Sequence, residues 1–380
     1  MLYRKFGKTN EMVSTLGFGC MRLPLLGEGD PTNIDEEKAI NLIRYAIDHG
    51  VNYVDTAYPY HGIDMKKGGK SEPLVGKALK NGYREKVKLA TKLPSWLIKT
   101  REDMDHYLND QLQRLDTNTI DFYLVHGIDS TTWPQLKEAG FPEFLDQAIK
   151  DGRIRYAGFS FHDKLDLFKE IVDYYDWSFC QIQYNYLDEE FQAGTEGLKY
   201  AAKKGLGITI MEPLRGGKLA NVPDDVKAVF NQAEIKKAPA EWGIGWILNH
   251  PEVSVVLSGM NEMEQVSENI KIASITEANA FTEKELDVIE KAKNIFMEKI
   301  KVNCTSCGYC MPCPEGVQIP RNFSAYNDYY MFGKSDNYRR FGPKQKASNC
   351  IECGKCEEHC PQGIKIPQEL KKVKELFEVS

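Results

Sequence analysis

Long apolar runs are missing from this sequence. No segment approaches the roughly 20 apolar residues of a membrane-spanning helix, and the start, MLYRKFGKTN, carries charge where a signal peptide needs an apolar stretch. A positive charge excess is missing too, because 49 Lys and Arg face 55 Asp and Glu, a net charge of −6. This balance does not favour a nucleic-acid-binding surface. We therefore expect a cytoplasmic protein with no membrane or nucleic-acid partner.

Short apolar runs, many of them β-branched, alternate with amphipathic stretches from residue 16 onward. This alternation predicts parallel strands joined by crossover helices. The predicted strands are residues 16–19, 51–56, 87–92, 120–126, 154–160, 179–185, 207–212 and 253–259. Eight such units in about 280 residues favour a closed (β/α)8 TIM barrel over an open doubly wound sheet.

Polar residues lie at or near the carboxyl ends of six predicted strands. They are Asp55, Lys92, His126, Ser160, Gln181 and Glu212. In a TIM barrel these ends form the active face, so the sequence predicts a site at that end.

Eight of the ten cysteines lie in two boxes near the end of the chain. Cys304, Cys307, Cys310 and Cys313 have the spacing C-x2-C-x2-C-x2-C-P. Cys350, Cys353, Cys356 and Cys360 have the spacing C-x2-C-x2-C-x3-C-P, which is that of bacterial ferredoxins. In a reducing cytosol such clusters indicate metal or redox ligands rather than disulfides.

The boxes predict two [4Fe-4S] clusters. In two-cluster ferredoxins the fourth cysteine of each run binds the other cluster. By that rule Cys360 joins Cys304, Cys307 and Cys310, while Cys313 joins Cys350, Cys353 and Cys356. Two zinc sites are the alternative, since paired C-x2-C motifs also bind zinc. The remaining cysteines, Cys20 and Cys180, lie in apolar runs and are expected in the core.

A helix is predicted over residues 282–300, with Thr282 as its capping residue and Glu285 three positions later. We expect the domain boundary just after it, which gives a barrel over residues 1–298 and a small, mainly α-helical ferredoxin-like domain over residues 299–380. The aromatic-rich segment 322–349 is expected to be helical and to pack around the groups that the cysteines bind.

Asp55, Tyr60, Lys92 and His126 follow consecutive predicted strands, in DTAYPYHG, LATKLP and YLVHGID. With these residues the chain resembles the aldo-keto reductases over roughly residues 1–295, and the four match that family's catalytic tetrad. The motifs KSEPLVGKAL, GFS and QIQYN are also similar to family motifs, and the cysteine boxes resemble its iron–sulfur branch. The resemblance implies an oxidoreductase that interconverts a small carbonyl compound and an alcohol.

The resemblance implies a role for each member of the tetrad. A phenol has an ordinary pKa of about 10, and a neighbouring Lys92 cation favours the phenolate and so makes Tyr60 a better proton donor. Asp55 holds Lys92, and His126 binds the substrate carbonyl. Tyr58 is a rival phenol, and the family spacing from Asp55 favours Tyr60.

A G-x-G-x-x-G fingerprint is absent, so NADP or NAD must be held in another way. In a barrel, the loops after strands seven and eight hold phosphates, here residues 212–219 and 258–269. The resemblance implies that Ser160 and Gln181 bind the carboxamide and that Glu268 and Asn269 bind the adenine. The other cofactor-binding residues that it implies are Met211, Leu214, Gly216, Gly259 and Gln265.

Departures from the family pattern leave the choice between NADP and NAD open. Phe161 replaces an asparagine, Met211 replaces a stacking aromatic ring, and the positions that usually grip a 2′-phosphate hold Gly259 and Gln265. One alternative is a flavin- or ferredoxin-linked reductase with little NAD(P)H use, because hydride transfer moves two electrons and a cluster moves one. Another is a redox-sensing subunit of a protein partner. A flavin can bridge hydride transfer and the one-electron clusters, and a redox protein is a candidate partner beside the carbonyl substrate.

Overall fold

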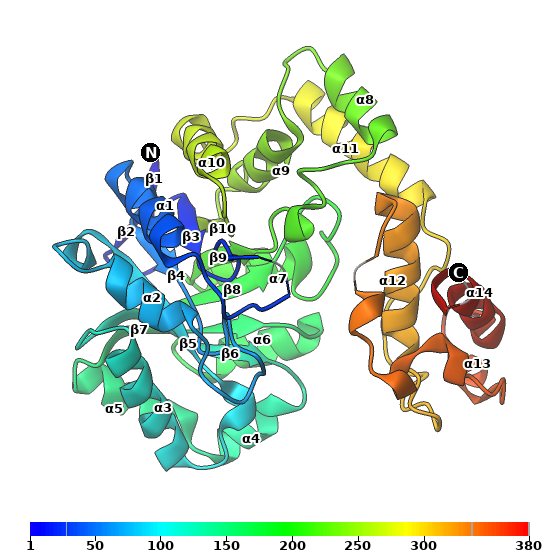
Figure 1. Ribbon diagram of the computed structural model, residues 1–380, viewed down its shortest axis with the longest axis horizontal. Helices are drawn as coiled ribbons and strands as arrows, with labels where there is room; N and C mark the ends of the chain where they lie inside the picture. Colours follow the sequence, from blue (N-terminus) through cyan, green and yellow to red (C-terminus); the bar gives the residue numbers. More distant parts are fainter. Residues whose placement is uncertain (28, 336, 379–380) are drawn as a thin grey trace. The chain divides into compact units, whose positions relative to one another are not determined.

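The computed structural model describes residues 1–27, 29–335 and 337–378, which form two compact units (Figure 1). The first unit consists of Met1–Ala220 and Ala240–Thr282. The second consists of Asn221–Pro239 and the chain from Glu283 onward. Each helix in the described ranges is too short or too polar to cross a membrane.

The first unit contains the predicted TIM barrel, which confirms the fold class. Its eight parallel strands close in the order β10, β3, β4, β5, β6, β7, β8, β9. Their bounds are β3 Leu16–Gly19, β4 Tyr53–Asp55, β5 Lys88–Leu93, β6 Ile120–Ile128, β7 Ile154–Phe161, β8 Phe179–Gln183, β9 Gly207–Met211 and β10 Val255–Ser258. Every predicted run overlaps one of these strands, and β5, β6 and β7 extend one or two residues past the end of their runs. The runs are almost continuously apolar because helices cover the outer side of each strand while the barrel core covers the inner side.

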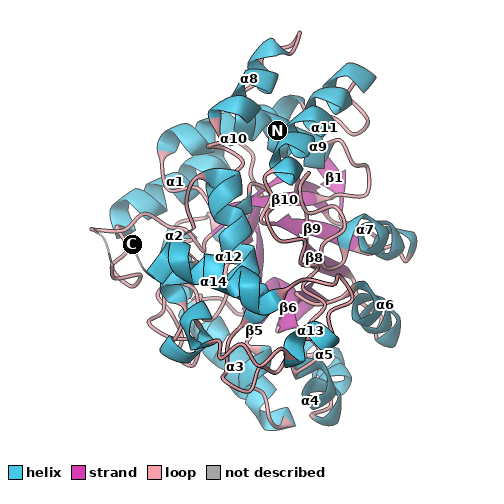
Figure 2. Cartoon of the chain, turned by 90° about the vertical axis from the view of Figure 1, so that its right-hand side faces the viewer, coloured by secondary structure: helices cyan, strands magenta, loops and turns pink. Residues whose placement is uncertain are grey.

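Helices surround the barrel strands, as α6 and α7 show outside β8 and β9 in Figure 2. Their bounds are α1 Glu36–Asp48, α2 Ser71–Ala78, α3 Arg101–Arg114, α4 Thr132–Glu138, α5 Phe141–Lys150, α6 Leu165–Tyr174, α7 Gly194–Lys203, α9 Pro239–Leu248 and α10 Met263–Ile275. Local capping sets where several begin. The side chain of Thr100 accepts the Asp103 N–H at the start of α3, and Asp103 caps the Thr100 N–H in return.

A short hairpin closes the amino-terminal end of the barrel. It pairs β1, Tyr3–Lys5, with β2, Met12–Ser14. The ring of Phe6 in this hairpin is fully buried and lies 4.6 Å from the Phe122 ring and 5.3 Å from the Phe179 ring. Gly7 has φ 55°, and a Cβ there would meet the Gly207 nitrogen at 2.1 Å. Only glycine fits this close approach, so the opposite end of the barrel is left for the site.

The second unit is helical, as predicted. Its helices are α8 Asp224–Gln232, α11 Glu283–Glu298, α12 Ile319–Phe332, α13 Lys355–Glu358 and α14 Ile366–Glu378. The predicted helix 282–300 corresponds to α11, which packs against α8. By their contacts these two helices belong with the second unit, whereas the predicted boundary follows residue 298.

The prediction of one long helix over residues 322–349 is wrong in its second half. Helix α12 ends at Phe332 because Gly333 adopts a left-handed conformation with φ 75°, and short 3-10 turns follow at 338–340, 343–345 and 347–349. The aromatic side chains of this segment do pack against the cysteines. Phe323, Tyr326, Tyr338 and Phe341 are buried in one core against which most of the box cysteines pack.

Candidate active site and cysteine-lined cavities

Three of the four tetrad side chains make direct contact at the carboxyl end of the barrel. Asp55 ends β4 and Lys92 lies in β5, so parallel pairing puts both at the same edge. Lys92 Nζ donates a hydrogen bond to Asp55 Oδ1 at 2.6 Å and lies 3.2 Å from Tyr60 Oη. It also donates to the Thr56 carbonyl at 2.8 Å. The buried ammonium thereby links the carboxylate to the phenol.

Burial and charge determine the protonation of this cluster. Burial lowers the pKa of Lys92, but Asp55 and Tyr60 outweigh it, and the net effect is a pKa above the ordinary value. Lys92 therefore stays charged. Burial raises the pKa of the Tyr60 phenol, and Lys92 opposes this rise only in part. The phenol holds its proton at neutral pH, and the adjacent cation can stabilise the phenolate that forms when the proton is given up.

His126, in β6, completes the group. Its ring lies edge-on to Tyr60, with ring centroids 6.0 Å apart, and 5.1 Å from the ring of Trp96. Ser95 Oγ donates to the His126 carbonyl at 2.5 Å and fixes its backbone. Burial, Lys92 and His162 hold the pKa of His126 well below 6.5, so the imidazole is neutral. Its buried Nδ1 has no hydrogen-bond partner in the described part of the chain.

The rival phenol, Tyr58, lies in different surroundings. Its ring packs edge-on against Tyr107 at 5.2 Å, and the Arg114 guanidinium lies 5.4 Å from its centre. Burial and nearby Asp110 raise its pKa. Lys92 Nζ lies 3.2 Å from Tyr60 Oη and 4.8 Å from the centre of the Tyr60 ring, so the structure brings Tyr60 into the cluster.

A buried polar network behind Lys92 was missed in the sequence. Glu72 is fully buried, pairs with Arg114 Nε at 2.8 Å and accepts from Gln111 Nε2 at 2.7 Å. Gln111 Nε2 also lies 3.0 Å from the Lys92 carbonyl, to which it donates. Glu72 is part of the quoted motif KSEPLVGKAL, but Gln111 comes from α3 and no short motif marks it. The network fixes the backbone that carries the ammonium.

Three residues at the ends of the next strands line the same face. Ser160 ends its predicted run in β7, and its Oγ accepts the Gly127 N–H at 2.7 Å. Gln181 in β8 lies beside Met211 of β9, with its Nε2 3.6 Å from the thioether sulfur. Gln181 Oε1 is a buried acceptor with no partner among the described residues. An incoming amide N–H can satisfy this acceptor.

The loop after β9 has an unusual backbone. Glu212, Arg215, Gly216 and Gly217 all have positive φ, at 53°, 48°, 67° and 91°. Two of them are not glycine, and such strain is concentrated at functional sites. Leu214 directly precedes the short 3-10 turn Arg215–Gly217 in this loop, and its side chain packs closely over Gly243.

The residues predicted toward the adenine end of the cofactor lie on α10 and on the loop before it. Some are exposed at the surface and others are buried. Gln265 and Glu268 are exposed, and Gln265 Oε1 accepts the Asn261 N–H at 2.9 Å. Asn269 is buried, and its amide donates to Ser258 Oγ at 3.0 Å. Gly259 follows β10 and lies under the side chain of Arg22.

Arg22 is another residue that the sequence interpretation missed. It follows the first barrel strand in GFGCMR, and only the fold brings it to the loops after β9 and β10. The remaining cysteines, Cys20 and Cys180, are fully buried, as expected.

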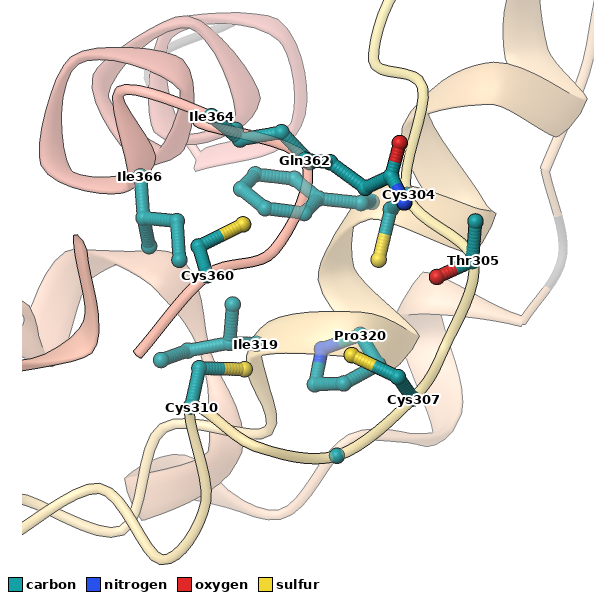
Figure 3. Close-up of a pocket in the computed structure, with 12 residues that line it drawn as sticks. Cys304, Thr305, Cys307, Cys310, Ile319, Pro320, Cys360, Gln362, Ile364 and Ile366 are labelled. Atoms are coloured by element: carbon teal, nitrogen blue, oxygen red, sulfur yellow. The ribbon is translucent and has the colours of Figure 1, made fainter. Parts of the chain in front are cut away.

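The two cysteine boxes contribute to two cavities in the second unit. Figure 3 shows Cys304, Cys307, Cys310 and Cys360 around the first cavity, whose lining also includes Ile319 and Phe323. The second cavity is lined by Cys310, Cys313, Cys350, Cys353 and Cys356. Each cavity therefore takes thiols from both boxes. Burial raises the pKa of Cys310 and of Cys356 to about 11, so these thiols are protonated at neutral pH until a metal binds.

Comparison with known proteins agrees with this geometry. The Aldo/keto reductase family profile matches residues 15–294, the span that carries the barrel and the tetrad. The chain belongs to the aldo/keto reductase family. A 4Fe-4S dicluster domain profile matches residues 303–364, which contain both cysteine boxes. The protein is thus an aldo-keto reductase oxidoreductase with an iron–sulfur domain.

Individual relatives cover the barrel. The chain is 29% identical over 301 residues to probable aldo-keto reductase 1 of Glycine max, which spans 70% of this chain and 82% of that protein. It is 26% identical over 316 residues to L-galactose dehydrogenase of Arabidopsis thaliana, over 77% and 95% of the two chains. The solved holo form of aldo-keto reductase AKR11C1 from Bacillus halodurans aligns with a TM-score of 0.63 at 26% identity, over 77% and 96%.

This aldo-keto reductase has residues that fit both expected groups. The unpartnered acceptor Gln181 Oε1 suits a carboxamide, and the exposed backbone at Gly216 suits a phosphate. The soft thiol donors around the two cavities suit iron–sulfur clusters.

Proposed function

We propose that the barrel interconverts a small carbonyl compound and its alcohol with NAD(P)H, and that two [4Fe-4S] clusters in the second unit relay electrons. The main support is one contact set. The buried ammonium of Lys92 lies 2.6 Å from Asp55 Oδ1 and 3.2 Å from Tyr60 Oη. A charged lysine held against a protonated phenol is the arrangement that proton transfer to a carbonyl oxygen needs.

The chain's residues handle the proton and the substrate oxygen. Tyr60 gives its proton to the carbonyl oxygen, and Lys92 stabilises the phenolate that remains. Neutral His126 donates a hydrogen bond to the same oxygen and orients the carbonyl. When bound, NAD(P)H supplies the two electrons as a hydride. In the direction of alcohol oxidation the Tyr60 phenolate takes the proton back.

The cofactor is proposed to lie across the carboxyl ends of β7 to β10. Ser160, Gln181 and Met211 would hold its carboxamide end, and Glu268 and Asn269 its adenine. Between them, the backbone at Leu214, Gly216 and Gly259 would receive the phosphates. Because Gly259 and Gln265 carry no charge for a 2′-phosphate, we expect NADH and NADPH to bind within about tenfold of each other.

For the second unit we propose that Cys304, Cys307, Cys310 and Cys360 hold one cluster and that Cys313, Cys350, Cys353 and Cys356 hold the other. The lining of the two cavities supports this division. Functionally, residues 1–298 would form the catalytic part and residues 299–380 the electron-relay part of a cytoplasmic enzyme. A redox protein or a bound flavin would exchange electrons with the relay.

Cofactor titration tests this function. NADH and NADPH are titrated into anaerobically prepared, cluster-loaded protein, and turnover of simple aldehydes is then measured. We expect saturable binding of both cofactors and aldehyde reduction that depends on them. If neither NADH nor NADPH binds, the result favours the flavin- or ferredoxin-linked alternative. Binding without any turnover would favour the redox-sensing subunit.

A further inference from the structure

Arg22 reaches between the two loops that follow the last barrel strands. Its aliphatic stem passes over Gly259, so closely that a Cβ at Gly259 would lie 3.1 Å from Arg22 Cβ and 3.2 Å from its Cγ. Its guanidinium ends beside Gly216, where a Cβ would lie 3.1 Å from Nη2. Glycine at both positions therefore leaves room for one arginine side chain to cross from β3 to the loop after β9.

The charge of Arg22 is only weakly engaged. Among the residues that the structure describes, its ionic contact is with Glu212, at 3.8 Å between Nη2 and Oε1, and the two side chains are 51% and 34% exposed. A long, solvent-exposed pair of this kind contributes little to stability. Most of the guanidinium donors thus remain available to a stronger acceptor, and a phosphate offers two oxygens in the geometry of the guanidinium fork.

The position of the guanidinium identifies which part of a dinucleotide it faces. Glu212 directly follows Met211, at the carboxamide end of the proposed cofactor site, while Glu268 and Asn269 on α10 lie at the adenine end. Gly216 and Gly259 lie on the loops between these ends. The pyrophosphate is the part of a dinucleotide that joins its two ends, and NADH and NADPH share it.

We propose that Arg22 binds the pyrophosphate of the nicotinamide cofactor, opposite the backbone of Gly216, and exchanges Glu212 for it when the cofactor enters. This inference rests on the proposed function. It also explains how the chain can hold the phosphates although Gly259 and Gln265 carry no charge. The positive charge comes from Arg22, which follows β3, the strand that closes the barrel against β10.

The test measures dissociation constants for NADH and NADPH by fluorescence titration of anaerobic, cluster-loaded protein. Arg22→Gln should weaken both cofactors by about tenfold to a hundredfold, since one charged hydrogen-bonding group is lost. The ratio of the two constants should stay within about threefold of the wild type. Arg22→Lys should recover part of the loss, because it keeps the charge without the fork.

Arg155→Gln is the matched control. Arg155 is similarly exposed, at 54%, and pairs with Asp121 at 3.4 Å, but it lies at the start of β7, at the opposite end of the barrel. Its replacement should leave both constants unchanged. Glu212→Gln should tighten both cofactors by a few fold, because it removes the competing carboxylate.

Each outcome gives a decision. If Arg22→Gln binds both cofactors within threefold of the wild type, the inference is wrong while the proposed function stands. If it weakens NADPH alone, Arg22 contacts the 2′-phosphate and the pyrophosphate assignment is wrong. If Glu212→Gln weakens both cofactors, the exchange of Glu212 is wrong. If the wild type binds neither, the proposed function fails and the inference fails with it.

Discussion

Lys92 and Asp55 form an ion pair that solvent does not reach, with a 2.6 Å contact and side-chain exposures of 0% and 3%. Removing one partner of such a pair leaves the other charge buried without compensation. The pair therefore constrains stability as well as the proposed chemistry, and the two effects can be separated by experiment.

Asp55→Ala is expected to lower the free energy of unfolding by about 3–5 kcal/mol, because the Lys92 charge stays buried without its partner. The double variant Asp55→Leu with Lys92→Met should be more stable than the single one, although it is inactive. Anaerobic urea unfolding measures both. If the double variant is less stable than the single variant, the loss of stability in Asp55→Ala does not come from an uncompensated Lys92 charge.

Tyr60→Phe is expected to reduce carbonyl turnover by roughly 10²- to 10⁴-fold, because it removes the proton donor and keeps the ring. Cofactor binding should change little. Tyr58→Phe is the control, since its ring contacts Tyr107 rather than Lys92. If the Tyr58 variant is the inactive one, the proton donor has been assigned to the wrong phenol.

The stability of the protein should fall as the pH drops below about 6.5. His126 has a folded-state pKa well below that value because it is buried, so the unfolded chain binds a proton that the folded chain does not. Stability then rises with pH across this window, by up to about 1.4 kcal/mol per pH unit for each such histidine. His126→Gln should flatten the slope measured by urea unfolding at several pH values.

Anaerobic preparation is expected to yield about eight iron and eight acid-labile sulfide per chain, because each cubane cluster carries four of each. Metal and sulfide analysis of freshly prepared protein measures this. Stoichiometric zinc without sulfide would contradict the cluster assignment and favour the zinc alternative.

Cys313→Ala should damage the cluster of the second box, although Cys313 belongs to the first box in sequence. It lines the second cavity together with Cys350, Cys353 and Cys356. Electron paramagnetic resonance of the reduced protein can separate the two clusters. Cys360→Ala is the reciprocal variant and should damage the first cluster. If each variant instead damages the cluster of its own box, the exchange of fourth ligands is wrong.

The barrel was predictable because its strands are buried on both faces. Leu16–Gly19 is a strand with the predicted bounds, and the run 154–160 differs from β7 by one residue. The apolar character of such a run indicates burial by itself. It requires no information on which residues, distant in the sequence, pack against the run. The β1 and β2 hairpin was not predicted, since three-residue strands give little alternation to detect.

The candidate site was predictable only where position along a strand determines position in space. Asp55 and Lys92 satisfy that condition. Arg22 does not, because its relation to Gly216 and Gly259 depends on barrel closure between β3 and β10. The helix expected over 322–349 failed for a local reason, since the prediction did not take Gly333 as a helix stop.

The sharing of thiols between the boxes has a consequence for the order of synthesis. A growing chain presents Cys304, Cys307 and Cys310 well before Cys360 has been made, so the first cavity then has only three of its four thiols. Under the proposed ligation, Cys360 would be the last of the eight ligands to be synthesised. The first cavity would therefore be the last to have all four of its thiols present.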